Sequence, residues 1–305
     1  MAYLDLLDGI LRGGAHGLGE SFAAAQAARI ECRELPDGGF TGRRGEAEDL
    51  YYTDFALRAL DLVAPQSPVF ETTARRLQWT AAAPGSVTDA FSLLSCARTL
   101  RRRRLTVRSD RGSIERVLAA QALPQGAFGA QGDSASVSAY QTFLAVLCLQ
   151  MIGDDAPSEA ACAQMASLQR DSGGFAERAS DDRAQTNATS AAAAVLLMGN
   201  ALGQVDLPAA AEFLAGCQAA DGGLAAHPDA RGGDLLSTFT GLLTLALIGA
   251  PSELDLPALG RFVRGAAHAG GGFGAMPGDP EADVEYTFYG IATLGLLRSL
   301  VEGAG

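Results

Sequence analysis

The chain has 305 residues, 48% of them hydrophobic, with a net charge of −12 and an isoelectric point near 4.7. This length and apolar content allow a large buried core, and the acidic balance argues against nucleic acid and anionic membranes as general partners. Because the sequence contains no Lys, Schiff-base chemistry on a lysine is excluded, and only Arg, His or backbone amides can hold an anion.

The cysteines indicate a reducing compartment. Five are scattered on apolar stretches, and none forms a CxxC pair, so we expect buried free thiols. No basic region precedes an apolar run at the N-terminus, which favours a cytoplasmic protein. The uncharged stretch 235–251 is almost long enough to span a bilayer, but its Ser, Thr and Gly content favours a buried helix, and we expect no membrane span.

One short phrase recurs along the whole chain. A Gly-rich turn ending in Phe or Leu is followed by a cap residue, mostly Asp, and by Thr four positions later. The turns begin at residues 38, 126, 173, 222 and 271, so the last three steps are 47, 49 and 49 residues. The first step of 88 residues is twice 44, a length close to that of the other steps, which predicts a degenerate copy near Pro84. The copies are Gly38–Phe40 with Asp49 and Thr53, Gly126–Phe128 with Ser138 and Thr142, Gly173–Phe175 with Asp182 and Thr186, Gly222–Leu224 with Asp234 and Thr238, and Gly271–Phe273 with Asp283 and Thr287.

Each copy predicts a helix, a turn and a second helix. The helices before the turns are amphipathic, as in 208–218 and 257–267, where an Asp and a Pro form the start. The helices after the turns are apolar almost all round, which is typical of helices covered on every side. These are expected at 89–100, 137–152, 186–197, 235–248 and 284–297.

This alternation predicts a closed repeat fold. Six helical hairpins with an enclosed inner ring and a half-exposed outer ring give an all-α, α/α toroid, which we expect to span residues 1–305 as one domain. The inner helices then share one direction, so Asp49, Asp182, Asp234 and Asp283 gather at one rim. Helix N-termini attract anions, although each Asp could instead simply cap its own helix.

The residues also resemble a known family. The segments 271–279 and 283–292 resemble the last repeat of protein prenyltransferase β subunits, with a pattern closest to those of Rab geranylgeranyltransferases. Gln121, Gln169 and Gln218, each placed before a turn, resemble the prenyltransferase–squalene oxidase repeat shared with squalene and terpene cyclases. The resemblance covers residues 18 to 300, and it implies an α/α toroid with an apolar funnel for an isoprenoid diphosphate.

In the family's transferases a zinc ion activates a protein thiol. The resemblance implies that the ligands Asp, Cys and His fall here on Asp234, Leu236 and Tyr286. Leu has no donor atom and neutral Tyr is a poor zinc ligand, so we expect no zinc and no other cofactor.

The diphosphate site is implied at the same rim. The family's basic positions fall on His227 and Arg231, and near Asp182, beside Arg183 and with Arg178 closer to the turn. Arg forks suit phosphate, whereas a loop Arg can also be merely solvated. We expect the chain or an allylic cation of the prenyl group to contact the ring faces of Tyr52, Tyr140, Phe239, Tyr286 and Tyr289.

We therefore expect a prenyltransferase-like enzyme that binds an isoprenoid diphosphate and transfers or ionises its prenyl group, with Asp234 as a relic of the metal site or an acid/base group. A helical α-type partner or a peptide acceptor is implied by the family. Two alternatives stay open. One is a one-barrel terpene cyclase that uses Glu285 or Asp283 as the acid, since the segment 283–287 lies where class II cyclases carry Asp-x-Asp-Asp-Thr. The other is a non-catalytic isoprenoid-binding or partner-binding scaffold.

Overall fold

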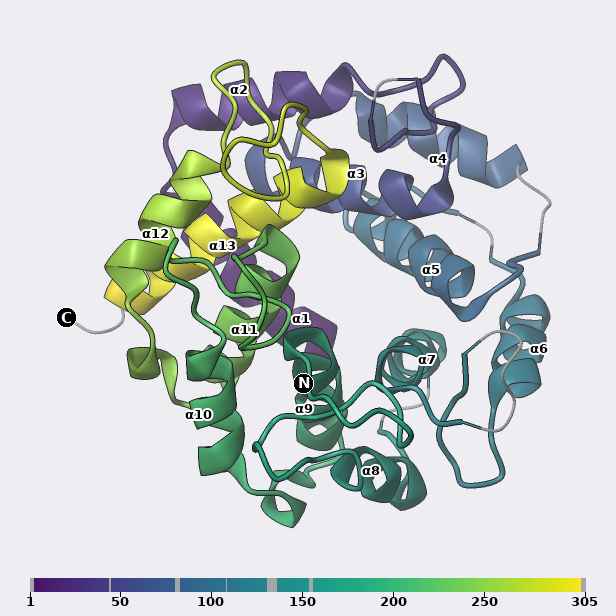
Figure 1. The fold of residues 1–305 in the computed structure, drawn as a ribbon. Helices are drawn as coiled ribbons and strands as arrows, with labels where there is room; N and C mark the ends of the chain where they lie inside the picture. Colours follow the sequence, from purple (N-terminus) through teal and green to yellow (C-terminus); the bar gives the residue numbers. More distant parts are fainter. Residues whose placement is uncertain are drawn as a thin grey trace. The chain divides into compact units, whose positions relative to one another are not determined.

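The computed structural model describes residues 3–43, 45–79, 83–107, 109–130, 136–153 and 156–302. These residues form thirteen α-helices and two short 3₁₀ helices, and their only β-structure is isolated bridges (Figure 1). The helices are α1 (Tyr3–Ala15), α2 (Glu20–Glu31), α3 (Leu50–Val63), α4 (Val69–Trp79), α5 (Val87–Arg101), α6 (Arg111–Gln121), α7 (Ala139–Ile152), α8 (Glu159–Ala166), α9 (Thr186–Met198), η1 (Leu202–Gln204), α10 (Leu207–Gly216), α11 (Leu235–Leu247), η2 (Pro251–Glu253), α12 (Leu256–Gly265) and α13 (Val284–Glu302).

The helices pack into two compact units, and each is described by itself. The middle unit comprises residues 1–6 and 115–262, and the terminal unit comprises residues 7–114 and 263–305. In the middle unit α9 packs against both α7 and α11. In the terminal unit α3 packs against both α5 and α13. These six helices, which we call the post-turn helices, include every helix that was expected to be enclosed.

Burial separates the two helix types as the sequence predicts. In α9 the run from Ala191 to Leu196 is buried without interruption, so this helix is covered on all sides. In α10, which precedes a turn, Leu214 is fully buried whereas Glu212 is exposed. A half-exposed helix therefore alternates with an enclosed one along the chain.

The turns depend on glycine in a left-handed conformation. The first glycine of five turns has φ between 85° and 93°; these are Gly38, Gly126, Gly173, Gly222 and Gly271. A Cβ atom on Gly222 would lie 2.5 Å from the carbonyl oxygen of Ala258, in the next pre-turn helix. The turn backbone thus touches that helix directly. At the degenerate copy, Gly85 lies before α5, where Ser86 caps the helix and Asp89 accepts from the Gly85 amide.

A buried threonine fixes each turn to the post-turn helix. Its hydroxyl oxygen accepts a hydrogen bond of 2.9–3.1 Å from the amide of the turn's last residue; the pairs are Thr53 with Phe40, Thr142 with Phe128, Thr189 with Phe175, Thr238 with Leu224 and Thr287 with Phe273. The role of this Thr is therefore structural in all five copies.

The third copy differs from the expected register. The anchoring residue there is Thr189, and Gln185 stands at the N-terminus of α9. Asp182, which was expected near that helix start, is instead exposed on the preceding loop. The hydroxyl of Thr186 donates to the carbonyl of Ala225 at 2.6 Å. Two threonines three residues apart fit the sequence phrase equally well, and only packing distinguishes them.

Neighbouring repeats are joined where the post-turn helices begin. In the middle unit the Ala139 amide donates to the Glu177 carbonyl at 3.0 Å, and the Thr186 amide donates to the Ala226 carbonyl at 2.9 Å. In the terminal unit the Val284 amide donates to the Gly42 carbonyl at 3.2 Å. Each helix thus starts beside the loop that leads into a neighbouring helix. Within each unit, the helix N-termini joined in this way lie at one end.

A second set of contacts, made by glutamine side chains, ties three of the turns to a pre-turn helix. Gln218 donates to the carbonyls of Gly222 and Asp255 and accepts from the Asp255 amide, and Gln169 makes the equivalent three bonds. In the terminal unit Gln26 of α2 accepts from the Gly272 amide at 2.7 Å. The first pre-turn helix therefore covers the last turn. Among the described residues, no helix combines the length and apolarity needed to cross a bilayer.

Candidate functional site

Two loops of the middle unit bring a basic pair together. Arg183 lies just before α9 and His227 lies on the loop before α11. The Arg183 guanidinium Nη1 is 3.0 Å from the His227 Nε2, a spacing at which the guanidinium donates to an unprotonated ring nitrogen. Arg183 is exposed and His227 is half-buried, so both can be reached from solvent. The structure therefore joins two of the four residues expected to bind diphosphate.

The other two basic residues lie on the same loops. Arg178 is half-buried, and its backbone amide donates to the carboxylate of Asp181 while its carbonyl accepts from Arg170. Arg170 bonds to five carbonyl oxygens of this segment, which fixes the shape of the loop. Arg231 is exposed, four residues after His227. All four basic residues precede the N-termini of α9 and α11, where helix dipoles favour negative charge.

The acidic end of the terminal unit has a different arrangement. Asp283 is buried and caps α13, since its carboxylate accepts from the Glu285 amide at 2.8 Å. The Arg43 guanidinium contacts the carboxylates of Asp283 at 3.2 Å and Asp279 at 3.6 Å. Asp283 is thus engaged as a helix cap and an ion-pair partner.

Glu285 faces an aromatic cluster in this unit. The Tyr51 hydroxyl donates to Glu285 Oε1 at 2.7 Å, which joins α3 to α13. Phe55 lies at the centre of the cluster, with its ring centroid 4.9 Å from that of Tyr51 and 5.3 Å from that of Tyr289. Burial, followed by the charge of Asp283, raises the pKa of the neighbouring Tyr52. The cluster offers an acid beside aromatic faces.

The expected contacts for a prenyl chain divide between the units. Tyr52, Tyr286 and Tyr289 belong to the terminal unit, where the Tyr286 and Tyr289 centroids are 6.4 Å apart. Tyr140 and Phe239 belong to the middle unit. Tyr140 is exposed at the start of α7, whereas Phe239 is only 4% exposed.

A family model now decides what the chain is. The model, described as the prenyltransferase α/α toroid domain, matches residues 21–83, 77–265 and 158–303. These segments cover most of the chain. The chain belongs to this family. The expected all-α, α/α toroid class and the resemblance noted in the sequence are thereby confirmed. A comparison with curated proteins finds no match.

Solved structures of related architecture agree with this assignment. Protein geranylgeranyltransferase-I of Candida albicans complexed with GGPP is similar with a TM-score of 0.70 and 14% identity, over 91% of this chain and 92% of that one. A variant type II terpene cyclase from Scytonema, in complex with geranylgeranyl dihydroxybenzoate, gives 0.60 and 15% over 98% and 99%. An inactive α-1,6-mannanase variant from a Salegentibacter species in complex with α-1,6-mannotriose gives 0.61 and 12% over 92% and 99%. At these identities the likeness shows the α/α toroid fold alone.

The family's zinc site can be tested on the donors of the middle unit. Both carboxylate oxygens of Asp234 are engaged by Ser237, one with its amide and one with its hydroxyl, each at 2.8 Å. Burial raises the pKa of Asp234, and these hydrogen bonds oppose the rise. Leu236, at the implied Cys position, has no donor atom. Within the described part of the chain, no three His, Cys, Asp or Glu side chains are grouped to hold a metal ion. The donors described at this position do not fit zinc.

Two features of the terminal unit were not found from the sequence. The first is the contact between Tyr51 and Glu285, which are 234 residues apart. The second is Asp54 of α3, which is 1% exposed, with Oδ2 at 3.6 Å from Arg58 Nη1. Burial raises the pKa of Asp54 to about 6, and the charge of Arg58 only partly offsets this. The Arg58 guanidinium lies 4.0 Å from the Phe288 centroid. A helical pattern in the sequence marks Asp54 as facing inward, but it gives no sign of its partner.

Proposed function

We propose that the protein binds an isoprenoid diphosphate and transfers or ionises its prenyl group without the usual zinc site. The observation that carries the proposal is the contact between Arg183 and His227 at the N-termini of α9 and α11. Membership of the prenyltransferase α/α toroid family supports the proposal. So does the C. albicans transferase of similar fold, which is complexed with GGPP.

The chemistry of this pair suits a diphosphate. An Arg fork donates two parallel hydrogen bonds to phosphate oxygens, and the N–H of a neutral His ring is a second donor. Positive charge placed there would stabilise the diphosphate as it leaves the prenyl carbon. Arg178 and Arg231 would supply further charge. Tyr140 and Phe239, which belong to the same unit, would contact the prenyl chain, because aromatic faces stabilise a developing allylic cation.

The absence of a metal is part of the proposal. Asp234, with Leu236 at the implied Cys position, would hold zinc too weakly to activate a thiol. Departure of the diphosphate from the prenyl carbon therefore depends on Arg183 and His227 in this mechanism. Asp234 remains as the cap of α11, fixed by Ser237.

A titration with geranylgeranyl diphosphate tests the proposal. We expect the wild-type protein to bind this ligand. Arg183→Gln should weaken the binding about tenfold or more, because a charge-assisted hydrogen bond is lost. The control is Arg261→Gln, which removes the same charge from an exposed position of α12 and should leave binding unchanged. Equal affinities of the two variants would refute the role of Arg183. Zinc is measured in the same samples, and stoichiometric zinc would contradict the metal-free mechanism.

The contact between Tyr51 and Glu285 favours one alternative, a terpene cyclase-like enzyme. Protonation of an alkene needs a carboxylic acid beside aromatic faces, and Glu285 lies next to the Tyr51–Phe55 cluster. In this case Glu285→Gln should abolish turnover of a geranylgeranyl substrate while the melting temperature is retained. Tyr51→Phe should shift the pH profile of kcat. If both variants keep wild-type turnover, the cyclase reading is wrong. Isoprenoid binding without any product would indicate a scaffold.

A further inference from the structure

Helix α3 of the terminal unit carries an arginine on a face that is otherwise aromatic and aliphatic. Tyr51, Phe55, Arg58 and Leu62 follow one another at spacings of four, three and four residues, which places them on one side of the helix. The helices α2, α5 and α13 pack against α3, and every residue from 53 to 60 except Arg58 is buried. Tyr51 and Leu62 are also partly exposed. Solvent therefore reaches this side of α3, which we call the Arg58 face.

Arg58 is largely enclosed but makes few polar contacts. Its side chain is 21% exposed, and Nη1 lies 3.6 Å from Asp54 Oδ2, which is longer than a usual hydrogen bond from N–H to oxygen. Nε and Nη2 have no acceptor within hydrogen-bond distance among the described residues. An Arg side chain has five N–H donors, and enclosed polar groups are usually hydrogen-bonded. The unused donors of Arg58 are therefore available to a ligand.

The carboxylate beside Arg58 is a weak counter-ion. Asp54 is 1% exposed, and its Oδ1 atom has no hydrogen-bond partner among the described residues. Burial raises the pKa of Asp54 to about 6, although the charge of Arg58 and a hydrogen bond from Ser95 oppose the rise. Asp54 is therefore partly protonated near pH 6, and it then neutralises Arg58 incompletely.

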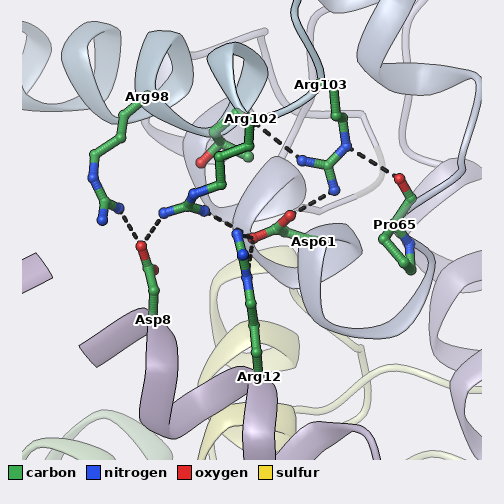
Figure 2. Close-up of polar contacts among 8 residues, drawn as sticks. Asp8, Arg12, Asp61, Pro65, Arg98, Arg102 and Arg103 are labelled. Atoms are coloured by element: carbon green, nitrogen blue, oxygen red, sulfur yellow. Dashed lines mark hydrogen bonds and ion pairs between the residues drawn. The ribbon is translucent and has the colours of Figure 1, made fainter. Parts of the chain in front are cut away.

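The groups of α5 near Asp54 do not replace it as a partner of Arg58. Arg98 is a cation, and its guanidinium is paired with Asp8 of α1 (Figure 2). Its charge lowers the pKa of Asp54 to a smaller extent than that of Arg58. Burial raises the pKa of the Cys96 thiol well above its ordinary value, so this group stays neutral. Neither side chain offers Arg58 a negative charge.

Aromatic rings hold the guanidinium of Arg58 in place. Its central carbon lies 4.0 Å from the ring centroid of Phe288 and 5.4 Å from that of Phe55. Stacking of this kind uses the flat face of a guanidinium and leaves its N–H edge free for hydrogen bonds. Hydrogen bonds are stronger in such apolar surroundings than in water. The Arg58 face thus presents a fixed, charged donor edge beside apolar surface.

We propose that the Arg58 face binds the carboxylate of an apolar carboxylic acid. A carboxylate accepts two parallel hydrogen bonds from an Arg fork, and the apolar body of the ligand would contact Tyr51 and Leu62. A single Arg matches the single negative charge of a carboxylate. A phosphate dianion would bring a second charge, which the neighbouring Asp54 would repel. The site belongs to the terminal unit and does not depend on the proposed diphosphate site.

Calorimetric titrations with phenylacetate and with octanoate test the site. Every sample carries Arg183→Gln, so that the proposed diphosphate site does not contribute; we call this protein the parent. We expect Arg58→Gln to weaken binding about tenfold or more, because a charge-assisted hydrogen bond is lost. The control is Arg264→Gln, which removes the same charge from an exposed position of α12 in the same unit and should leave binding unchanged. Arg58→Lys should lie between them, since it keeps the charge and loses the fork.

The pH dependence of binding is a second readout. Ionised Asp54 competes with the ligand for Arg58, so the affinity of the parent should fall as pH rises through about 6. The carboxyl group of the ligand, with an ordinary pKa, stays ionised in this range. Asp54→Asn removes the competing charge. Its affinity should stay level through this range and exceed that of the parent at higher pH.

Three results would overturn the proposal. They are equal affinities of Arg58→Gln and Arg264→Gln, binding of the uncharged phenylacetamide as tight as that of phenylacetate, and a lack of binding of both acids to the parent. Melting temperatures are measured on all variants. If Arg58→Gln does not fold, Arg58→Lys and Asp54→Asn decide the outcome. Parent-like affinity of the Lys variant together with parallel pH curves of the Asn variant and the parent would then reject the site.

Discussion

Asp54 shows how one enclosed side chain ties stability to pH. Its Oδ1 atom has no hydrogen-bond partner among the described residues, and its Oδ2 atom lies 3.6 Å from Arg58 Nη1. Burial favours the protonated form, so the folded state holds a proton that the unfolded chain releases near pH 3.8. Ionisation of Asp54 therefore destabilises the folded protein.

Asp54→Asn should change the pH dependence of unfolding in a defined direction. Because the pKa is raised in the folded state, the wild-type free energy of unfolding falls as pH rises from 3.8 to about 6, by on the order of 3 kcal/mol. The Asn variant lacks this contribution. We expect the difference in unfolding free energy between variant and wild type to grow across this interval and then stay constant. Urea unfolding at a series of pH values measures it.

Other carboxylates titrate in the same range, so only the difference between the two proteins is informative. Asp61→Asn serves as a comparison, because Asp61 is held by three arginines. That variant should be destabilised at neutral pH by the loss of these contacts. Parallel pH curves for wild type and Asp54→Asn would show that Asp54 is ionised throughout.

The turns need glycine for two separate reasons, a positive φ and a close approach of the next helix, and Gly→Ala substitutions distinguish them. Gly222 and Gly249 both have a positive φ, but a Cβ atom on Gly249 meets nothing within 4 Å, whereas on Gly222 it meets the Ala258 carbonyl. We expect Gly249→Ala to lower the unfolding free energy by about 1–2 kcal/mol through backbone strain alone. Gly222→Ala should lose about 1–3 kcal/mol more because α12 must move. Equal losses in denaturant unfolding would argue against the close approach.

The threonine anchors give a prediction for hydrogen bonding. Thr238→Val removes the acceptor of the buried Leu224 amide and keeps the size of the side chain. We expect a loss of about 1–3 kcal/mol in unfolding free energy, because the amide is left unsatisfied. Thr238→Ser, which keeps the hydroxyl, should lose much less. A Val variant as stable as the Ser variant would mean that water replaces the hydroxyl.

The helices and turns could be predicted from the sequence because their signals are local. The spacing from turn to threonine is nearly constant, and the apolar runs gave the starts and ends of α9 and α11 to within one residue. The anchoring threonine of the third copy was predicted wrongly, because both Thr186 and Thr189 match the threonine position of the repeated motif. The packing of α9 selects Thr189, and no local pattern contains that information.

The candidate sites were less accessible to sequence reasoning. Arg183 and His227 were both expected at the diphosphate site because the family resemblance places basic residues at these positions, and the structure brings the two side chains into contact. Tyr51 and Glu285 lie on different helices 234 residues apart, so no spacing rule joins them. Arg102 and Arg103 belong to a run of four arginines, and nothing in the sequence shows that Asp61 pairs with both of them.

Contacts between the first and last repeats make distant segments depend on one another. Gln26 of α2 accepts from the Gly272 amide, and a Cβ on Gly271 would lie 2.3 Å from the Ala25 carbonyl. Gln26→Leu should lower the unfolding free energy by about 1–3 kcal/mol. Hydrogen exchange should then quicken in α2 and in the turn at 271 together. Gln218→Leu, the matched change, should affect the turn at 222 instead.

The same contact has a consequence for synthesis on the ribosome. Gln26 and its partner are separated by 246 residues, so at about 5–20 residues per second α2 waits roughly 12–50 seconds for the turn it covers. During that interval α2 can pack against α3, but Phe22 lacks the ring of Phe273, whose centroid lies 6.3 Å from its own in the finished structure. The nascent chain therefore exposes part of the apolar surface of α2 until the last repeat has been synthesised. A chaperone acting early in translation has this segment to shield.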